Sequence, residues 1–168
     1  MIPINVGTIQ AFIDMGRLPW TEGTILTIHD LVAAGICKRS SVKHGIKLLA
    51  DRHETLHTPI QIHVSRASEA AIAAIEKVGG EVTTVHYNRL ALRALLQPEK
   101  FGTILPKQAR PPPKWQPYYT NWDKYRGYLS VQAQMRDLLK ERPELEEAFS
   151  KALVKNDEED SNTNTSSS

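Results

Sequence analysis

The chain has 168 residues, of which 40% are hydrophobic and 24% are charged, so it can form one ordinary packed domain with extensions. No apolar run approaches the roughly 20 residues of a membrane-spanning helix, which predicts a soluble protein with no membrane partner. The single cysteine, Cys37, excludes a disulfide framework and any zinc site with two or more cysteine ligands. The first five residues resemble no targeting signal, so we expect either none or a sequence that begins inside a longer protein.

The net charge of +2 is distributed unevenly along the chain. Residues 36–115 contain thirteen Lys and Arg residues against six Asp and Glu residues, a net charge of +7. The segments before and after carry −2 and −3. A positive middle segment favours contact with a polyanion over a merely solvated surface. We therefore expect the nucleic-acid-binding part to lie roughly between Ile36 and Trp115.

Two short helices are expected before residue 36. The first begins at Asn5, a good N-cap, continues with apolar residues at helical spacing, and ends at Gly16. The second begins at Thr27, where Asp30 completes a capping box, and ends at Gly35. The apolar side chains of both helices are expected to be core.

Strands and helices are expected to alternate up to residue 97. The patterns indicate strands over residues 45–49, 58–64 and 82–87. Ser65 is a candidate cap for a helix that ends at Gly79, and Asn88 is a candidate cap for another that Pro98 closes. Together these elements predict an α/β fold, a compact mixed domain of short strands and helices over residues 1–97.

The composition changes after this domain. Residues 98–129 are rich in Pro, Trp and Tyr, with too many prolines for a regular helix or a central strand, so we expect an extended arm that lies on a partner surface. Residues 130–155 are expected to form a helical extension of two helices, the second beginning at Pro143. The acidic, Ser-rich tail of residues 156–168 should be disordered.

Two clusters of basic residues are candidates for contacts with RNA. Residues 38–47 contain four Lys and Arg residues together with two serines and Gly45. Lys and Arg neutralise phosphates, and hydroxyl and backbone N–H groups position them. Residues 107–114 contain three more cations among prolines, followed by Trp115. Extended basic segments with aromatic residues can follow RNA and stack on exposed bases, with a solvated loop as the alternative.

Other kinds of chemistry have weaker support. His53, His57 and His63 could belong to a small metal-dependent enzyme, but no helical H-x-x-x-H pair or cysteine cluster accompanies them, so surface or RNA-facing histidines are favoured. Cys37 lies beside two cations that could lower its pKa, but nothing nominates a catalytic base, so a buried thiol is favoured. No phosphate-binding glycine loop is present, and we expect no cofactor.

A spaced pattern runs through residues 45–85. It consists of a lysine and two aliphatic residues, a strand, and then a Ser, an Ala, an aliphatic residue and a Gly, at Lys47, Leu48, Leu49, Ser68, Ala71, Ile75 and Gly79. This stretch resembles large-subunit ribosomal protein 15 in its bacterial or organellar form. Residues 5–35 are similar to the two short helical segments of that family. One departure is Arg52, which stands where the family usually has glycine.

The resemblance implies a fold of the ribosomal protein 15/18e type and a structural role in the large ribosomal subunit. The expected partners are large-subunit rRNA and neighbouring ribosomal proteins, with no catalysis, no metal and no small-molecule substrate. The residues expected to bind RNA are Lys38, Arg39, Lys43, Lys47, Arg52, Lys107, Arg110, Lys114 and Trp115. The alternative is a protein-interaction adaptor that uses the Pro/Trp/Tyr arm.

The long basic, Gly-rich N-terminal arm of the family is missing from this sequence. We therefore expect the sequence to represent the C-terminal half of a family member. Its extension beyond Tyr87 is similar to that of fungal mitochondrial members. This favours a mitochondrial ribosome as the location, with the cytoplasm as the alternative.

Overall fold

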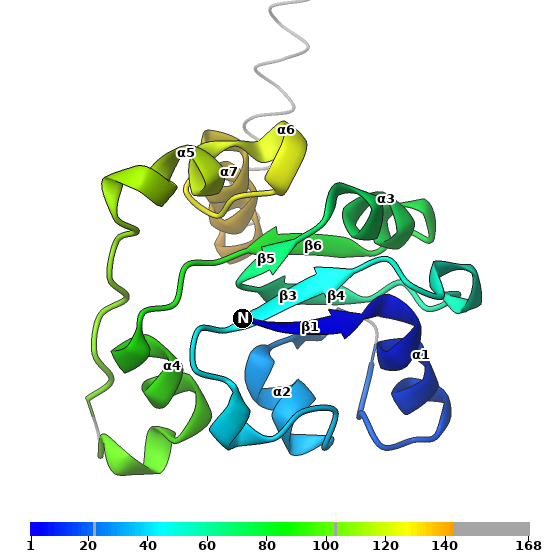
Figure 1. Cartoon of the computed structure of the whole chain (residues 1–168). Helices are drawn as coiled ribbons and strands as arrows, with labels where there is room; N and C mark the ends of the chain where they lie inside the picture. The colour runs from blue at the N-terminus through cyan, green and yellow to red at the C-terminus, as the bar shows by residue number, and fades with distance from the viewer. Residues whose placement is uncertain (22, 103, 143–168) are drawn as a thin grey trace, which may run out of the picture. The chain divides into compact units, whose positions relative to one another are not determined.

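The computed structural model describes residues 1–21, 23–102 and 104–142 (Figure 1). Its strands are β1 (Ile2–Asn5), β2 (Ile25–Leu26), β3 (Ile46–Leu49), β4 (Gln61–Val64), β5 (Arg66–Ala67) and β6 (Glu81–Thr84). Its α-helices are α1 (Val6–Asp14), α2 (Ile28–Ala33), α3 (Glu69–Lys77), α4 (Arg89–Leu96), α5 (Gln116–Thr120), α6 (Trp122–Tyr125) and α7 (Val131–Glu141). Short 3-10 helices are η1 (Arg39–Ser41), η2 (His53–Thr55), η3 (Pro98–Lys100) and η4 (Pro113–Trp115). Residues 1–130 form one compact unit.

The strands form two parallel sheets, and successive strands along the chain alternate between them. One sheet has the order β1-β3-β5 and the other β2-β4-β6. In the first sheet Ile2 pairs with Ile46, and in the second Gln61 pairs with Glu81. Parallel neighbours need crossover connections, and α1, α2 and α3 lie in those connections. This arrangement confirms the predicted α/β class.

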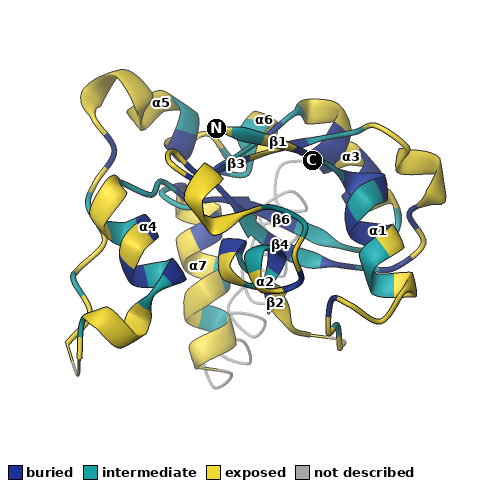
Figure 2. Ribbon diagram, turned by 60° about the horizontal axis from the view of Figure 1, so that its bottom comes forward, coloured by how far each residue is buried: buried dark blue, intermediate teal, exposed yellow. Residues whose placement is uncertain are grey.

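Apolar residues of both sheets and of the surrounding helices form the core. Ile46 and Leu48 of β3 and Ile62 and Val64 of β4 are at most 1% exposed. Figure 2 shows that α1, α3 and α4 each combine buried and exposed residues, as expected for amphipathic helices that cover a core. Burial of Ile60, Ile62 and Val64 confirms the alternation predicted from residue 58 onward.

The predicted helix starts are largely confirmed. Asn5, Thr27 and Asn88 are the N-caps of α1, α2 and α4. The carboxylate of Asp30 accepts hydrogen bonds from the backbone N–H and the hydroxyl of Thr27, both at 2.7 Å, and the bond from the backbone N–H belongs to the expected capping box. Burial alone would raise the pKa of Asp30, but these hydrogen bonds outweigh it and the pKa is lowered.

The predicted cap at Ser65 is wrong. Ser68 is the N-cap of α3, and its Oγ accepts a hydrogen bond from the backbone N–H of Ala71 at 3.3 Å. The reason is β5, in which Arg66 and Ala67 pair with β3 before the helix can begin. Strand pairing with a distant segment therefore moved the helix start three residues along the chain.

The extended arm predicted after residue 97 is partly replaced by helices. Pro113 and Pro117 lie in the first turns of η4 and α5, where a missing N–H costs little. Tyr119 is 2% exposed and donates its hydroxyl hydrogen to the carbonyl oxygen of Ser65 at 3.0 Å. The arm therefore packs against the chain's own fold, although residues 104–112 have no regular secondary structure. The domain division at residues 97, 129 and 155 stays a prediction.

The helix α7 confirms the first of the two C-terminal helices predicted from the sequence. The second, predicted to begin at Pro143, and the predicted tail over residues 156–168 lie outside the described residues. Among the helices of residues 1–142 that the structure describes, none is long and apolar enough to cross a membrane.

Candidate nucleic-acid interface

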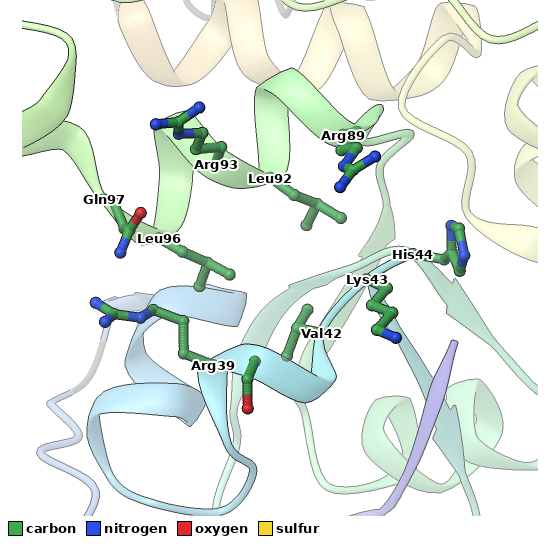
Figure 3. A pocket seen from close by; sticks show the side chains of 10 residues that line it. Arg39, Val42, Lys43, His44, Arg89, Leu92, Arg93, Leu96 and Gln97 are labelled. Atoms are coloured by element: carbon green, nitrogen blue, oxygen red, sulfur yellow. The ribbon is translucent and has the colours of Figure 1, made fainter.

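A groove of about 640 Å³ opens between η1 and α4. Four cations line it, Arg39 and Lys43 from one wall and Arg89 and Arg93 from the other (Figure 3). Figure 3 shows the apolar side chains of Val42, Leu92 and Leu96 between the two pairs. No Asp or Glu occurs among the described residues that line this basic groove. Its charge therefore favours an anionic ligand.

The amphipathic character of α4 places its two arginines on the groove. The side-chain oxygen of Asn88 accepts a hydrogen bond from the backbone N–H of Ala91 at 2.7 Å, which fixes the start of the helix. Leu92 and Leu96 are buried. Arg89 and Arg93 are exposed and four residues apart, so they lie on one face of the helix, one turn from each other.

A second hollow of about 370 Å³ adjoins the groove, because Lys43, His44 and Arg89 line both. We call it the Trp115 hollow. The other residues that line it are Met1, Ser65, Arg66, His86, Tyr87, Asn88, Trp115 and Tyr119. The guanidinium carbon of Arg66 lies 3.8 Å from the centre of the Trp115 ring, a cation–π contact. The hollow thus combines cations with aromatic rings.

Five of the residues predicted to bind RNA lie in or near these two depressions. Arg39 and Lys43 line the groove, and Lys43 and Trp115 line the hollow. Lys38 is exposed and directly precedes η1. The Nζ atom of Lys114 lies 5.9 Å from the centre of the Trp115 ring. The structure therefore brings parts of the two predicted basic clusters to one region.

The other four predicted residues line neither depression. Lys47 is exposed on β3, where its register partner is Arg66 of β5. Arg52 follows the C-terminal end of β3 and has a φ angle of 55°, the left-handed conformation that favours glycine. Lys107 and Arg110 are exposed in the irregular segment before η4. The structure therefore does not place these four residues on the same surface as the groove.

Three cations of this region were not predicted from the sequence. Arg66 belongs to a two-residue strand with no clear sequence signal. Arg89 and Arg93 lie more than forty residues after the first basic cluster, so charge counting along the chain does not group them with it. Their spacing of four residues on an amphipathic helix was the available signal.

The structure shows the surroundings of His57 and of Cys37. The Nε2 atom of His57 lies 3.5 Å from Asp14 and 3.1 Å from the side-chain nitrogen of Gln10, on α1. In the described part of the chain no three His, Cys, Asp or Glu side chains could hold a metal ion together. Burial raises the pKa of the Cys37 thiol, contrary to the lowering that its basic neighbours could cause. Cys37 is half-buried against the core, so the expectation of a buried thiol is met only in part.

Comparison with known proteins identifies the family. The family of ribosomal proteins 50S-L15 and 50S-L18e, which also includes a protein of the 60S subunit, matches residues 3–83. A relative from Schizosaccharomyces pombe, named large ribosomal subunit protein uL15m, is 39% identical over 136 residues, or 80% of this chain. The chain belongs to this ribosomal protein family. The predicted resemblance and the predicted fold type are therefore confirmed.

Further relatives of the same name come from Neurospora crassa, 33% identical over 79% of this chain, and from Danio rerio, 32% identical over 82%. The chain spans about half the length of these relatives, 51%, 49% and 49% for the three in turn. A bacterial family member from a Methylobacterium species, named uL15, is 44% identical over 80 residues, or 48% of the chain.

The matches to the mitochondrial relatives extend over segments that line the groove and the Trp115 hollow. The matches to the mitochondrial relatives cover about four fifths of the 168 residues, so they extend well beyond residue 83 wherever they begin. The mitochondrial matches therefore include α4 and the segment with Trp115. The family match itself ends before them.

Proposed function

We propose that this chain is a structural constituent of the mitochondrial ribosome's large subunit, and that its basic groove binds large-subunit rRNA. The observation that carries the proposal is a groove lined by four cations and, within residues 1–142 as the structure describes them, by no carboxylate. It is partly built by a domain of a ribosomal protein family. The names of the fungal and fish relatives support the mitochondrial large subunit as the location.

The arrangement of the cations suits an RNA backbone. Arg39 and Lys43 face Arg89 and Arg93 across the groove, so phosphates between them would be neutralised from both sides. Such contacts position an RNA helix without reading its bases. Lys38 and Lys114 would extend this contact. We propose Lys47, Arg52, Lys107 and Arg110 as contacts to RNA outside the groove.

We infer a scaffolding role without catalysis, with neighbouring large-subunit ribosomal proteins as further partners. The adaptor alternative is less favoured, because the arm's aromatic residues contact each other and the chain's own backbone. The rings of Tyr118 and Tyr125 are stacked with centres 4.2 Å apart, and the Tyr118 hydroxyl lies 3.3 Å from the carbonyl oxygen of Ala67. Few of these rings remain for a peptide ligand.

Sedimentation tests the proposed function. A tagged form of the whole native protein, expressed in cells, should sediment with the mitochondrial large subunit at moderate salt. It should leave the particles when high salt screens its phosphate contacts in the presence of EDTA, which loosens the RNA fold. Recovery of the protein only in the unassembled fractions, with the large subunit intact, would contradict the proposal.

A further inference from the structure

Three buried polar atoms of the Trp115 hollow have no hydrogen-bond partner among the described residues. They are Ser65 Oγ, Arg66 Nε and His86 Nδ1, and all three residues line the hollow. Ser65 as a whole is only 1% exposed. Buried polar groups in folded proteins are nearly always paired with protein, water or a ligand, so three such groups at one hollow favour a polar occupant there.

The backbone around Ser65 leaves room for this arrangement. Gly45 has a φ angle of +84°, and a Cβ atom at this position would overlap the Ser65 hydroxyl. The carbonyl oxygen of Ser65 is already used by the Tyr119 hydroxyl. The Ser65 side chain is thus held at the hollow beside a glycine, with its own hydroxyl unused.

The aromatic side of the hollow is partly covered by Arg66 and still accessible. Arg66 lies between two rings, with its guanidinium carbon 3.8 Å from the centre of Trp115 and 5.0 Å from the centre of Tyr118. This contact packs the Arg66 guanidinium on one face of the Trp115 ring, which is nevertheless 39% exposed. A ring that already has a packing partner loses less freedom when a flat ligand stacks on it.

The charge of the hollow selects for an anion. Lys43, Arg66 and Arg89 line it, and no Asp or Glu does so among the described residues. Its volume of about 370 Å³ falls within the range of about 300–1,000 Å³ typical of small-ligand sites. A planar group next to a phosphate, which is the chemistry of a nucleotide, would satisfy both the rings and the cations.

We propose that the Trp115 hollow binds one unpaired nucleotide of the RNA that occupies the basic groove. The base stacks on the face of the Trp115 ring that Arg66 does not cover, and its phosphate lies against Lys43 and Arg89. The inference rests on the proposed function. Because Lys43, His44 and Arg89 line both depressions, a backbone in the groove passes the mouth of the hollow. A base inside a regular duplex has no free face to offer and cannot enter.

Two RNA hairpins test the proposal, one with a single bulged 2-aminopurine and one fully paired but otherwise identical. The protein should bind the bulged hairpin about tenfold to a hundredfold more tightly, which is the effect of one stacked base. Stacking on Trp115 should also quench the 2-aminopurine fluorescence. Trp115→Ala should remove the preference for the bulged hairpin, so that this variant binds the two hairpins equally. Trp115→Phe, which keeps a stacking ring, should retain most of the preference.

Each other outcome overturns a distinct part of the proposal. If Trp115→Ala weakens both hairpins equally, or neither, the hollow holds no unpaired base. If free AMP displaces the bulged hairpin at concentrations similar to the hairpin's own dissociation constant, the hollow is a mononucleotide site instead. If the wild-type protein binds neither hairpin, the proposed function fails together with this inference. Thermal melting followed by circular dichroism shows whether Trp115→Ala is folded, and Trp115→Phe keeps the test valid if it is not.

Discussion

Replacement of Lys43, Arg89 and Arg93 by glutamate should weaken binding to large-subunit rRNA by at least about a hundredfold at moderate salt. Each lost phosphate contact removes the release of condensed counterions, and each new carboxylate repels the RNA. The slope of log affinity against log salt should fall by about two to three units for three contacts. Filter binding or fluorescence anisotropy over a salt series measures both quantities.

A control variant separates the groove from net charge. Lys77→Glu, Lys100→Glu and Arg142→Glu change the charge by the same amount at exposed positions that do not line the groove. This variant should lose much less affinity. All six positions are exposed, so neither variant should change the free energy of unfolding by more than about 0.5 kcal/mol per site. Equal losses for the two variants would mean that the groove is not the binding surface.

Tyr119→Ala should lower the free energy of unfolding by about 3–5 kcal/mol, the usual effect of deleting a buried aromatic ring. The ring is 2% exposed and meets His86, Tyr118 and Tyr128 edge to face. Burial raises the pKa of its phenol, which Arg66 partly opposes, so the group stays protonated and keeps its hydrogen bond at neutral pH. Urea unfolding followed by circular dichroism measures the change.

Tyr119→Phe is the matched control. It keeps the ring and loses the hydroxyl with its hydrogen bond to Ser65 and its interaction with Arg66, so it should cost about 1 kcal/mol. If Tyr119→Ala were as stable as Tyr119→Phe, the arm would not be docked on the fold as the structure has it.

The helices of the domain could be predicted because their signals are local. The caps at Asn5, Thr27 and Asn88 lie next to the helices that they begin, and each helix has an apolar face. The family resemblance could also be predicted, because residues 45–85 combine a strand and a helix with a characteristic spacing. All but the last two residues of this stretch lie within the family match, which ends at residue 83.

The short strands could not be predicted because their stability is not local. β2 and β5 have two residues each and exist only through pairing with β4 and β3. β1 contains Pro3 and was not recognised as a strand. Without β5 the sequence offered Ser65 as a reasonable cap, and only the pairing of Arg66 with Lys47 excludes it.

Only part of the candidate site could be predicted, because some of its residues come together through packing of distant segments. Arg39 and Lys43 belong to a cluster that is visible along the chain, whereas Arg89 and Arg93 reach the same groove only through the packing of α4. Trp115 was predicted as part of an extended arm, yet its position depends on Tyr119 and Arg66. Proline content excluded a long regular helix but not the short helices that begin at Pro113 and Pro117.

Ultraviolet cross-linking of intact mitochondrial large subunits, followed by mass spectrometry of the nucleotide-bearing peptides, tests the groove most directly. We expect rRNA cross-links on peptides that contain residues 38–44 and 86–97 of this chain, together with Trp115. Cross-links confined to the opposite end of the domain, on α1 or α3, would show that a different surface meets the RNA.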